Sequence, residues 1–173
     1  LDGGHHPVHR LRDRVAVARD GALTVRFGKK TAVFEIGSAA ARWADRITDP
    51  PSRLDKLGVK SGMRIVLTGT AHADLIEEIK GRGAHVSRTA PPRSADILFY
   101  GTERREALDR VSELRAALKP DGALWVIRPK GSAAISESEV MAAGKRAGLV
   151  DVKVVSFSPT HTAEKFVIPR AAR

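Results

Sequence analysis

The fold is decided by the stretch MRIVLTGTAHADLI at residues 63–76. Its apolar residues Ile65, Val66 and Leu67 are typical of a buried β-strand, and Gly69 stands before a short loop and a helix-forming segment. A strand that passes through a glycine into a helix is the usual start of a parallel α/β sheet, and nucleotides often bind at this joint. A nucleoside-binding loop normally carries two or three glycines, whereas Gly69 stands alone. The stretch therefore predicts the fold of the chain but does not indicate its activity.

The segments that follow alternate between helix and strand patterns. We expect strands at 64–68, 84–88, 95–100 and 123–127, and helices at 74–80, from Thr102 to Leu118, and from Ser136 to Ala147. Ser136 and Glu139 have the spacing of a capping box, which marks the start of the last helix. Two adjacent strands, 150–157 and 165–168, end the chain. This order predicts an α/β fold whose mainly parallel sheet ends in a C-terminal antiparallel hairpin.

Residues 14–58 are predicted to form a small N-terminal subdomain, a β-meander followed by a helix. Its strands are expected at 14–18, 22–27 and 31–36, and Asp20-Gly21 is a strong hairpin turn signal. The helix after Ser38 repeats apolar residues at helical spacing, namely Ala40, Trp43, Ala44 and Ile47. We therefore expect Trp43 to be a core residue, packed on the apolar face of the meander that carries Phe34 and Ile36.

Composition limits the classes of partner and site. The net charge of +10 is spread over the chain without a concentrated cluster, which favours an ordinary solvated surface. The partner is therefore unknown, and an anionic small molecule or nucleic acid on the basic surface is the alternative. Cysteine is absent, which excludes disulfides and thiolate metal sites, and no metal-binding motif is present, so no metal is expected. There is no apolar run of about 18 residues and no signal-peptide pattern, so we expect a cytoplasmic protein without a membrane partner.

Two further expectations concern the N-terminal part of the chain. Residues 1–13, which include His5, His6 and His9, are expected to be a flexible arm. The edge of the meander at residues 14–36 could pair with another chain, which would make a homo-oligomer.

The segment ALKPDGALWVI at 117–127 resembles the Leu-Lys-Pro-Gly-Gly turn and strand of class I S-adenosylmethionine (SAM)-dependent methyltransferases. The order of elements over residues 59–168 is also similar to their Rossmann-like core. A closer resemblance is to a small bacterial family of unknown activity with a methyltransferase-like core, in which we expect a tryptophan near the position of His161. It is carried by KLGVKSG at 56–62, GALWV at 122–126 with Pro129-Lys130 after it, GLVDVKV at 148–154 and KFV at 165–167. The resemblance implies one Rossmann-like, methyltransferase-like domain over residues 59–173.

The resemblance also implies where a cofactor would bind. The positions that match are Gly69, Thr70, Ala71 and His72 after the first strand, Arg88 at the end of the second, and Tyr100 at the end of the next. The methyltransferases hold the ribose hydroxyls with a carboxylate where this chain has Arg88, and one strand–helix unit is missing between Thr89 and Ser94. Together with His72 and Arg88, the side chains of Arg128 and Lys130 would form a basic crevice that suits an anionic ligand.

These departures favour a methyltransferase-like protein with a degenerate cofactor loop, which acts by binding an unknown ligand and has no catalytic residue and no cofactor. Two alternatives stand beside this hypothesis. The first is a divergent SAM-dependent methyltransferase, which would bind SAM with the loop at residues 69–72. The second is a basic nucleic-acid-associated protein, whose binding would weaken steeply as salt is added.

Overall fold

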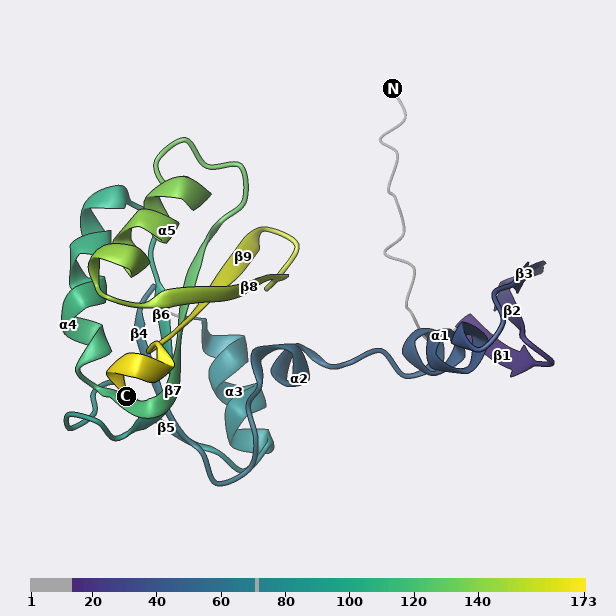
Figure 1. Cartoon of the computed structure of the whole chain (residues 1–173), viewed down its shortest axis with the longest axis horizontal. Helices are drawn as coiled ribbons and strands as arrows, with labels where there is room; N and C mark the ends of the chain where they lie inside the picture. Colours follow the sequence, from purple (N-terminus) through teal and green to yellow (C-terminus); the bar gives the residue numbers. More distant parts are fainter. Residues whose placement is uncertain (1–13, 71) are drawn as a thin grey trace. The chain divides into compact units, whose positions relative to one another are not determined.

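The structure is a computed structural model, and it describes residues 14–70 and 72–173 (Figure 1). The arm expected at residues 1–13 lies outside the described residues. The chain divides into two compact units, Leu1–Ser52 and Arg53–Arg173, which we call the N-terminal and C-terminal units.

The division comes before the short helix α2 (Arg53–Leu57), whereas the sequence placed it after residue 58. Leu54 and Leu57 of this helix are buried in the core of the C-terminal unit. Helix α2 therefore belongs to the C-terminal unit, whereas Pro50 and Pro51, which precede it, belong to the N-terminal unit.

The N-terminal unit is an antiparallel meander with one helix. Its strands β1 (Arg14–Arg19), β2 (Ala22–Phe27) and β3 (Lys30–Glu35) pair in this order, and α1 (Ala39–Thr48) follows. Asp20 and Gly21 both have positive φ, 49° and 80°, as a two-residue hairpin turn requires. The predicted meander and helix are confirmed.

Helix α1 covers only part of one face of the meander. The hydroxyl of Thr48 donates to the carbonyl oxygen of Ala16 at 3.2 Å, which holds this side of the helix against β1. The buried core is small and rich in alanine, and consists of Ala16, Leu23, Ala40 and Ala44. Trp43 is 45% exposed and Phe34 is 51% exposed. The expectation that both are core residues is therefore wrong, because the alanines of α1 contact β1 and β2 without extending over β3.

The C-terminal unit is built on a six-stranded sheet in the order β5-β4-β6-β7-β9-β8. The first four strands in this order are parallel, and β9 runs antiparallel to both β7 and β8. The strands are β4 (Arg64–Gly69), β5 (His85–Ser87), β6 (Ala95–Gly101), β7 (Leu118–Pro129), β8 (Val150–Ser156) and β9 (His161–Val167). The predicted mainly parallel sheet with a C-terminal antiparallel hairpin is confirmed.

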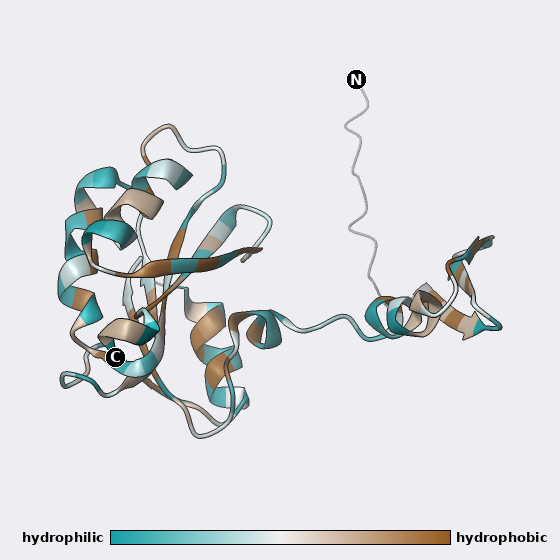
Figure 2. Ribbon diagram, in the orientation of Figure 1, coloured by the Kyte–Doolittle hydropathy of each residue, from teal (hydrophilic) through white to brown (hydrophobic). Residues whose placement is uncertain are grey.

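Helices cover both faces of this sheet (Figure 1). On one face α2 and α3 (Ala73–Gly81) pack against Ile65, Leu67 and Trp125. On the other face the 3-10 helix η2 (Arg105–Arg110), α4 (Val111–Arg115) and α5 (Glu137–Arg146) pack against Leu98, Leu124 and Phe166. Figure 2 shows α3 with a hydrophobic and a hydrophilic side, as expected of a helix at the surface of a layered core. The capping box of Ser136 and Glu139 is present at the start of α5.

Two boundaries differ from the prediction. The helix expected from Thr102 to Leu118 is shorter, because Leu118 already belongs to β7 and pairs with Ala95. Residues 119–122, predicted as a turn, lie inside β7, where the register shifts and Gly122 lets the strand approach β6 closely. Strand β9 begins at His161 instead of at residue 165, because β7 extends to Pro129 and pairs with it.

The connection from β5 to β6 is a short return. Residues 88–94 contain neither a strand nor a helix, so no strand–helix unit lies between Thr89 and Ser94, as the sequence indicated. Strand β5 is therefore an edge strand of three residues. Within the described ranges, no helix is long and apolar enough to cross a membrane.

Candidate functional site

The joint between β4 and α3 is held by close backbone contact. Gly69 has a φ of 80°, and a Cβ at this position would overlap the carbonyl oxygen of Gly101. The amide of Thr70 donates a hydrogen bond to the same oxygen at 2.8 Å. Glycine is required here both for its left-handed backbone and for the lack of a side chain. Strands β4 and β6 consequently stay paired to their last residues.

The ends of β4 and β6 mark the point where the connections of the sheet diverge. Strand β4 leads through α3 to β5 on one side, whereas β6 leads through η2 and α4 to β7 on the other. Ligands of open α/β sheets bind at such a point, at the carboxyl ends of the strands. An open hollow of about 320 Å³ lies there, which we call the carboxyl-edge hollow. Its lining brings together three of the predicted residues, Gly69, Thr70 and Tyr100.

Charged side chains of both signs also line the carboxyl-edge hollow. They are Glu103 and Arg104, which follow β6, and Arg110 at the end of η2. These three residues were not predicted from the sequence. The available signal was their position directly after a buried strand, because side chains that follow parallel strands gather at the carboxyl edge of the sheet.

Tyr100 forms a wall of the hollow and offers no free hydroxyl. Its side chain is 2% exposed, and its hydroxyl donates to the carbonyl oxygen of Ala107 at 2.7 Å. Burial raises the pKa of the Tyr100 hydroxyl, so it stays protonated. The guanidinium carbon of Arg110 lies 5.7 Å from the centre of the ring, a cation–π contact that orders this side of the hollow.

His72 precedes α3 but does not line the carboxyl-edge hollow. Its ring packs edge-on against Phe157 and His161, with centroid distances of 4.9 Å and 5.2 Å. Its Nε2 is buried without a hydrogen-bond partner in the described part of the chain. Burial and the neighbouring His161 lower the pKa of His72, which favours the neutral ring. Residues 14–70 and 72–173 contain no group of three His, Asp or Glu side chains that would hold a metal ion.

The other predicted residues lie apart from the hollow. Arg88 is exposed on the return loop after β5 and does not line the carboxyl-edge hollow, and Ala71 lies outside the described residues. Lys130 donates to the Ser156 hydroxyl at 2.8 Å and to the Ser158 carbonyl oxygen at 2.7 Å. The structure therefore does not gather these side chains with His72 into one basic crevice.

Arg128, the remaining member of the expected crevice, forms a buried ion pair that the sequence analysis missed. Its Nε and Nη2 lie 2.9 and 2.8 Å from Oε1 of Glu164, whose side chain is fully buried. The Oε2 atom of Glu164 has no hydrogen-bond partner among the described residues. Burial raises the pKa of the Glu164 carboxyl, and Arg128 opposes this shift only in part. Arg128 is thus committed to the core between β7 and β9.

Comparison with solved structures identifies the fold. A SAM-dependent methyltransferase from Aquifex aeolicus matches with a TM-score of 0.57 and 19% identity, over 72% of this chain and 93% of the other. A SAM-dependent methyltransferase from Archaeoglobus fulgidus matches with 0.52 and 11%, over 72% and 98%. The pyocyanin biosynthetic protein PhzM matches with 0.51 and 14%, over 76% of this chain and 59% of its own. No model of a protein family and no curated protein matches the sequence. The chain therefore has the Rossmann-like fold of SAM-dependent methyltransferases, as its resemblance implied.

These neighbours overturn the expectation that the chain takes no cofactor. That expectation rested on the glycine-poor loop at Gly69 and on the missing carboxylate near Arg88. The proteins with the same fold include two that depend on SAM. The composition of one loop was therefore too narrow a basis for excluding a cofactor.

Proposed function

We propose that this protein binds SAM in the carboxyl-edge hollow. The observation that carries the proposal is the position and charge of this hollow, which lies where the connections of the sheet diverge and is lined by Glu103, Arg104 and Arg110. SAM carries an ammonium group, a sulfonium group and a carboxylate. A carboxylate and two guanidinium groups complement these charges, and ligands of this size fit pockets of about 300 Å³ and more.

The fit is partial, which predicts weak binding. Glu103 would accept from the ammonium group, and the two arginines would donate to the carboxylate. The ribose lacks its usual partner, because residues 82–95 contain no acidic side chain. The hydroxyl of Ser87 donates to the carbonyl oxygen of Thr89 at 2.8 Å and is a poor substitute.

We further propose that the protein acts by binding SAM and does not transfer its methyl group. Methyl transfer to an oxygen or nitrogen is helped by a side chain placed to take up the proton of the acceptor. The side chains best suited to this role are engaged elsewhere: the Tyr100 hydroxyl donates to Ala107, and His72 faces Phe157. A protein of this kind would respond to the SAM concentration.

The test is calorimetric titration with SAM and S-adenosylhomocysteine, with matched variants. Glu103→Gln removes the charge that lines the hollow, whereas Glu106→Gln removes an equal charge from η2 outside the lining. We expect Glu103→Gln to weaken SAM binding about tenfold, as loss of a charge-assisted hydrogen bond does, and Glu106→Gln to leave it unchanged.

Two results would refute the proposal. Absence of binding at millimolar SAM, or equal affinity for SAM in both variants, would reject the site. Formation of S-adenosylhomocysteine when the protein is mixed with SAM and cell extract, and its loss with Glu103→Gln, would overturn the binding-only role while keeping the site.

A further inference from the structure

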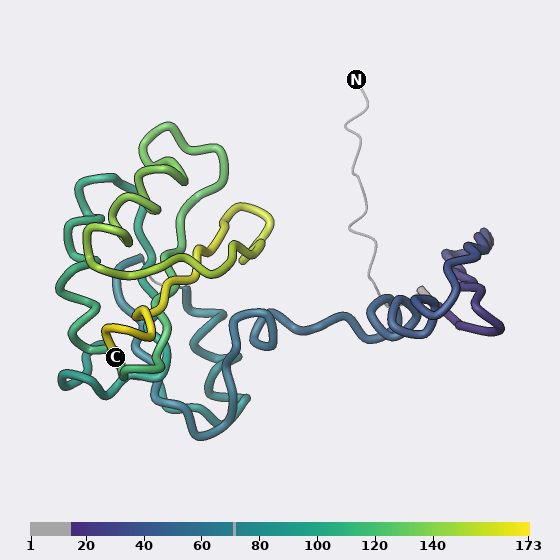
Figure 3. Tube along the Cα trace, viewed as in Figure 1, coloured from purple at the N-terminus to yellow at the C-terminus, as the bar shows by residue number. Residues whose placement is uncertain are grey.

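A second hollow lies at the opposite, amino-terminal edge of the sheet. It is an open hollow of about 370 Å³ between the end of α4, the start of β7 and residues 168–173. Figure 3 shows the C-terminal end of the trace beside the start of β7, two segments that are distant in sequence. We call this feature the amino-edge hollow, and it is separate from the residues considered above for SAM.

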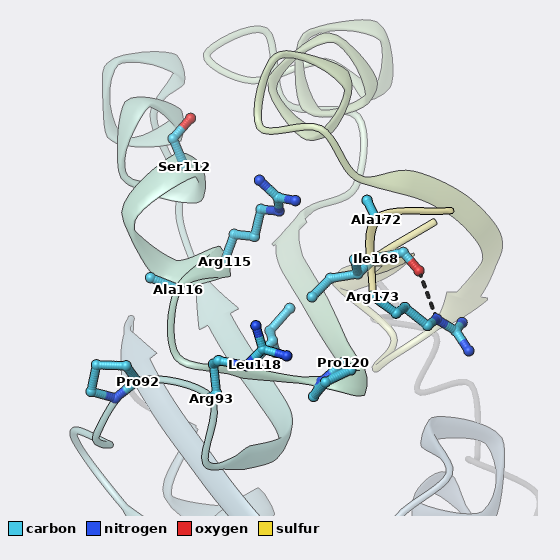
Figure 4. A pocket seen from close by; sticks show the side chains of 10 residues that line it. All are labelled: Pro92, Arg93, Ser112, Arg115, Ala116, Leu118, Pro120, Ile168, Ala172 and Arg173. Carbon is cyan, nitrogen blue, oxygen red and sulfur yellow. Dashed lines mark hydrogen bonds between the residues drawn. The ribbon is translucent and has the colours of Figure 1, made fainter. Parts of the chain in front are cut away.

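Three arginines, Arg93, Arg115 and Arg173, line the amino-edge hollow. None of them forms an ion pair with an acidic side chain of the described residues, and no acidic residue lines the hollow. Figure 4 shows the side chains of Arg93 and Arg115 extending into the space between α4 and the C-terminal segment. Arg173 is held by a hydrogen bond from its Nε to the carbonyl oxygen of Ile168, at 3.1 Å. Unpaired guanidinium groups in a concave surface produce a positive potential that attracts anions.

The floor of the hollow is apolar. Leu118 and Ile168 are 1% and 7% exposed, and Pro120 lies beside them in the lining. The hollow thus offers charge at its rim and apolar surface at its base. A ligand that satisfies both would carry an anionic group and an apolar body.

Arg93 adopts a conformation that costs stability. Its φ is 55°, and the turn at residues 91–94 places it after Pro92, in a position that normally takes glycine or asparagine. The turn is fixed, because the amides of Arg93 and Ser94 donate to the carbonyl oxygens of Ala116 and Ala117 at 2.9 and 3.0 Å. Glycine would satisfy the same backbone with less strain, and strained residues cluster at functional sites. The turn itself does not require an arginine at this position, and the arginine places a guanidinium group in the lining of the hollow.

We propose that the amino-edge hollow binds a phosphate monoester with an apolar or aromatic ester group. Guanidinium groups donate two parallel hydrogen bonds to phosphate oxygens, and a phosphate dianion matches the combined charge of Arg93 and Arg115 better than a single carboxylate does. The apolar floor formed by Leu118 and Ile168 would receive the ester group. The volume of the hollow suits a small molecule.

The probes for the test are phenyl phosphate, inorganic phosphate and phenol, followed by calorimetry and by amide chemical shifts in a buffer free of other multivalent anions. We expect phenyl phosphate to bind the full chain more tightly than inorganic phosphate, and phenol not to bind. The shifts should centre on residues 91–94, 115–118 and 168. Glu103→Gln should leave this binding unchanged, which separates it from the proposed SAM site.

The decisive variant is Arg93→Gly, with Arg42→Gln as its control. Arg42 is exposed on α1 in the N-terminal unit, and its loss lowers the net charge equally. Arg93→Gly should weaken phenyl phosphate binding by at least about tenfold. It should also raise the melting temperature, because glycine relieves the left-handed strain. Arg115→Gln should weaken binding without raising the melting temperature.

Four outcomes would overturn the proposal. They are no binding of phenyl phosphate at millimolar concentration, unchanged binding in Arg93→Gly, an equal loss in Arg42→Gln, and equal affinities for phenyl phosphate and inorganic phosphate. The third would indicate a general effect of net charge, and the last would remove the role of the apolar floor.

Discussion

The two units of this chain differ in how far they bury their aromatic side chains. In the C-terminal unit Phe99 and Trp125 are fully buried, because helices cover both faces of their sheet. In the N-terminal unit Phe34 and Trp43 are about half exposed, because one helix lies over β1 and β2 only. The apolar content of a strand therefore does not decide its burial. The number and reach of the covering layers decide it.

The chain itself allows the two units to be followed separately. It contains two tryptophans, Trp43 in α1 and Trp125 in β7. A Trp43→Phe background leaves fluorescence from the C-terminal unit only, and Trp125→Phe leaves it from the N-terminal unit only.

A large loss of stability is expected from Gly69→Ala. The new Cβ would overlap the carbonyl oxygen of Gly101, and the left-handed φ adds strain. Backbone strain costs about 1–3 kcal/mol and overpacking about 1–3 kcal/mol, so we expect a loss on the order of 4 kcal/mol in the C-terminal unit. Urea unfolding followed by Trp125 fluorescence measures this loss.

The control for Gly69→Ala is Gly28→Ala in the N-terminal unit. Gly28 also has a positive φ, 57°, but no atom lies within 4 Å of a Cβ placed there. It should cost about 1 kcal/mol, from the backbone alone. Equal losses in the two variants would show that the β4–β6 contact is not rigid and would weaken the comparison between the units.

The second prediction compares one substitution in both units. Phe99→Ala should destabilise the C-terminal unit by about 3–5 kcal/mol, because it leaves a cavity in a core that is covered on both sides. Phe34→Ala removes a side chain that is 51% exposed and should cost less than about 1 kcal/mol. The urea midpoints from Trp125 and Trp43 fluorescence give the two values. A loss at Phe34 as large as that at Phe99 would mean that another surface covers β3.

The same contrast explains what the sequence could predict. The succession of strands and helices along the C-terminal unit was predictable, because strands such as 123–127 are continuously apolar and are separated from the helices by turn residues. Burial of Trp43 was mispredicted, because helical periodicity gives the direction of a side chain but not the width of the surface opposite it. Ala40 and Ala44 indicated a narrow contact between this helix and the meander, since small residues bring a helix close to a sheet without widening the contact area.

The carboxyl-edge hollow was predicted in part for a related reason. Gly69, Thr70 and Tyr100 lie there because the fold fixes the carboxyl ends of β4 and β6. His72 was placed correctly at the joint, but its side chain packs against Phe157 and His161, which are contributed by a hairpin about 85 residues later in the chain. Contacts of this kind depend on tertiary packing, which a local pattern does not contain.

The third prediction is a difference in acid sensitivity. The pKa of His72 is lowered by burial and then by His161, so the folded ring resists protonation. Below its ordinary value of 6.5 the unfolded chain takes up a proton that the folded chain does not, and stability falls as the pH falls. The described part of the N-terminal unit contains no histidine and should lack this dependence.

The measurement is the urea midpoint at pH 7.5 and pH 5.5, with Trp125 and Trp43 read separately. The variant His72→Gln separates the effect of this histidine from that of Glu164. The raised pKa of Glu164 acts with the opposite sign, because the stabilisation that it contributes is lost as the pH rises. The fall with acid should be smaller in His72→Gln than in the parent protein, and His161→Gln should raise the pKa of His72 in an NMR titration. An unchanged acid response in His72→Gln would assign it to other groups.

The smallest effect is expected from Trp43→Gln in the N-terminal unit. A side chain that is 45% exposed contributes little to folding, so the free energy of unfolding should fall by less than about 1 kcal/mol. Amide exchange of β1–β3 can measure this change, since the variant lacks the fluorescent reporter of this unit. If a second copy of the chain covers Trp43 and Phe34, the parent protein will instead show protection that rises with protein concentration, and Trp43→Gln will abolish that rise. In that case the aromatic side chains of the N-terminal unit would be buried between two copies of the chain, just as Phe99 and Trp125 are buried by the helices that cover their sheet.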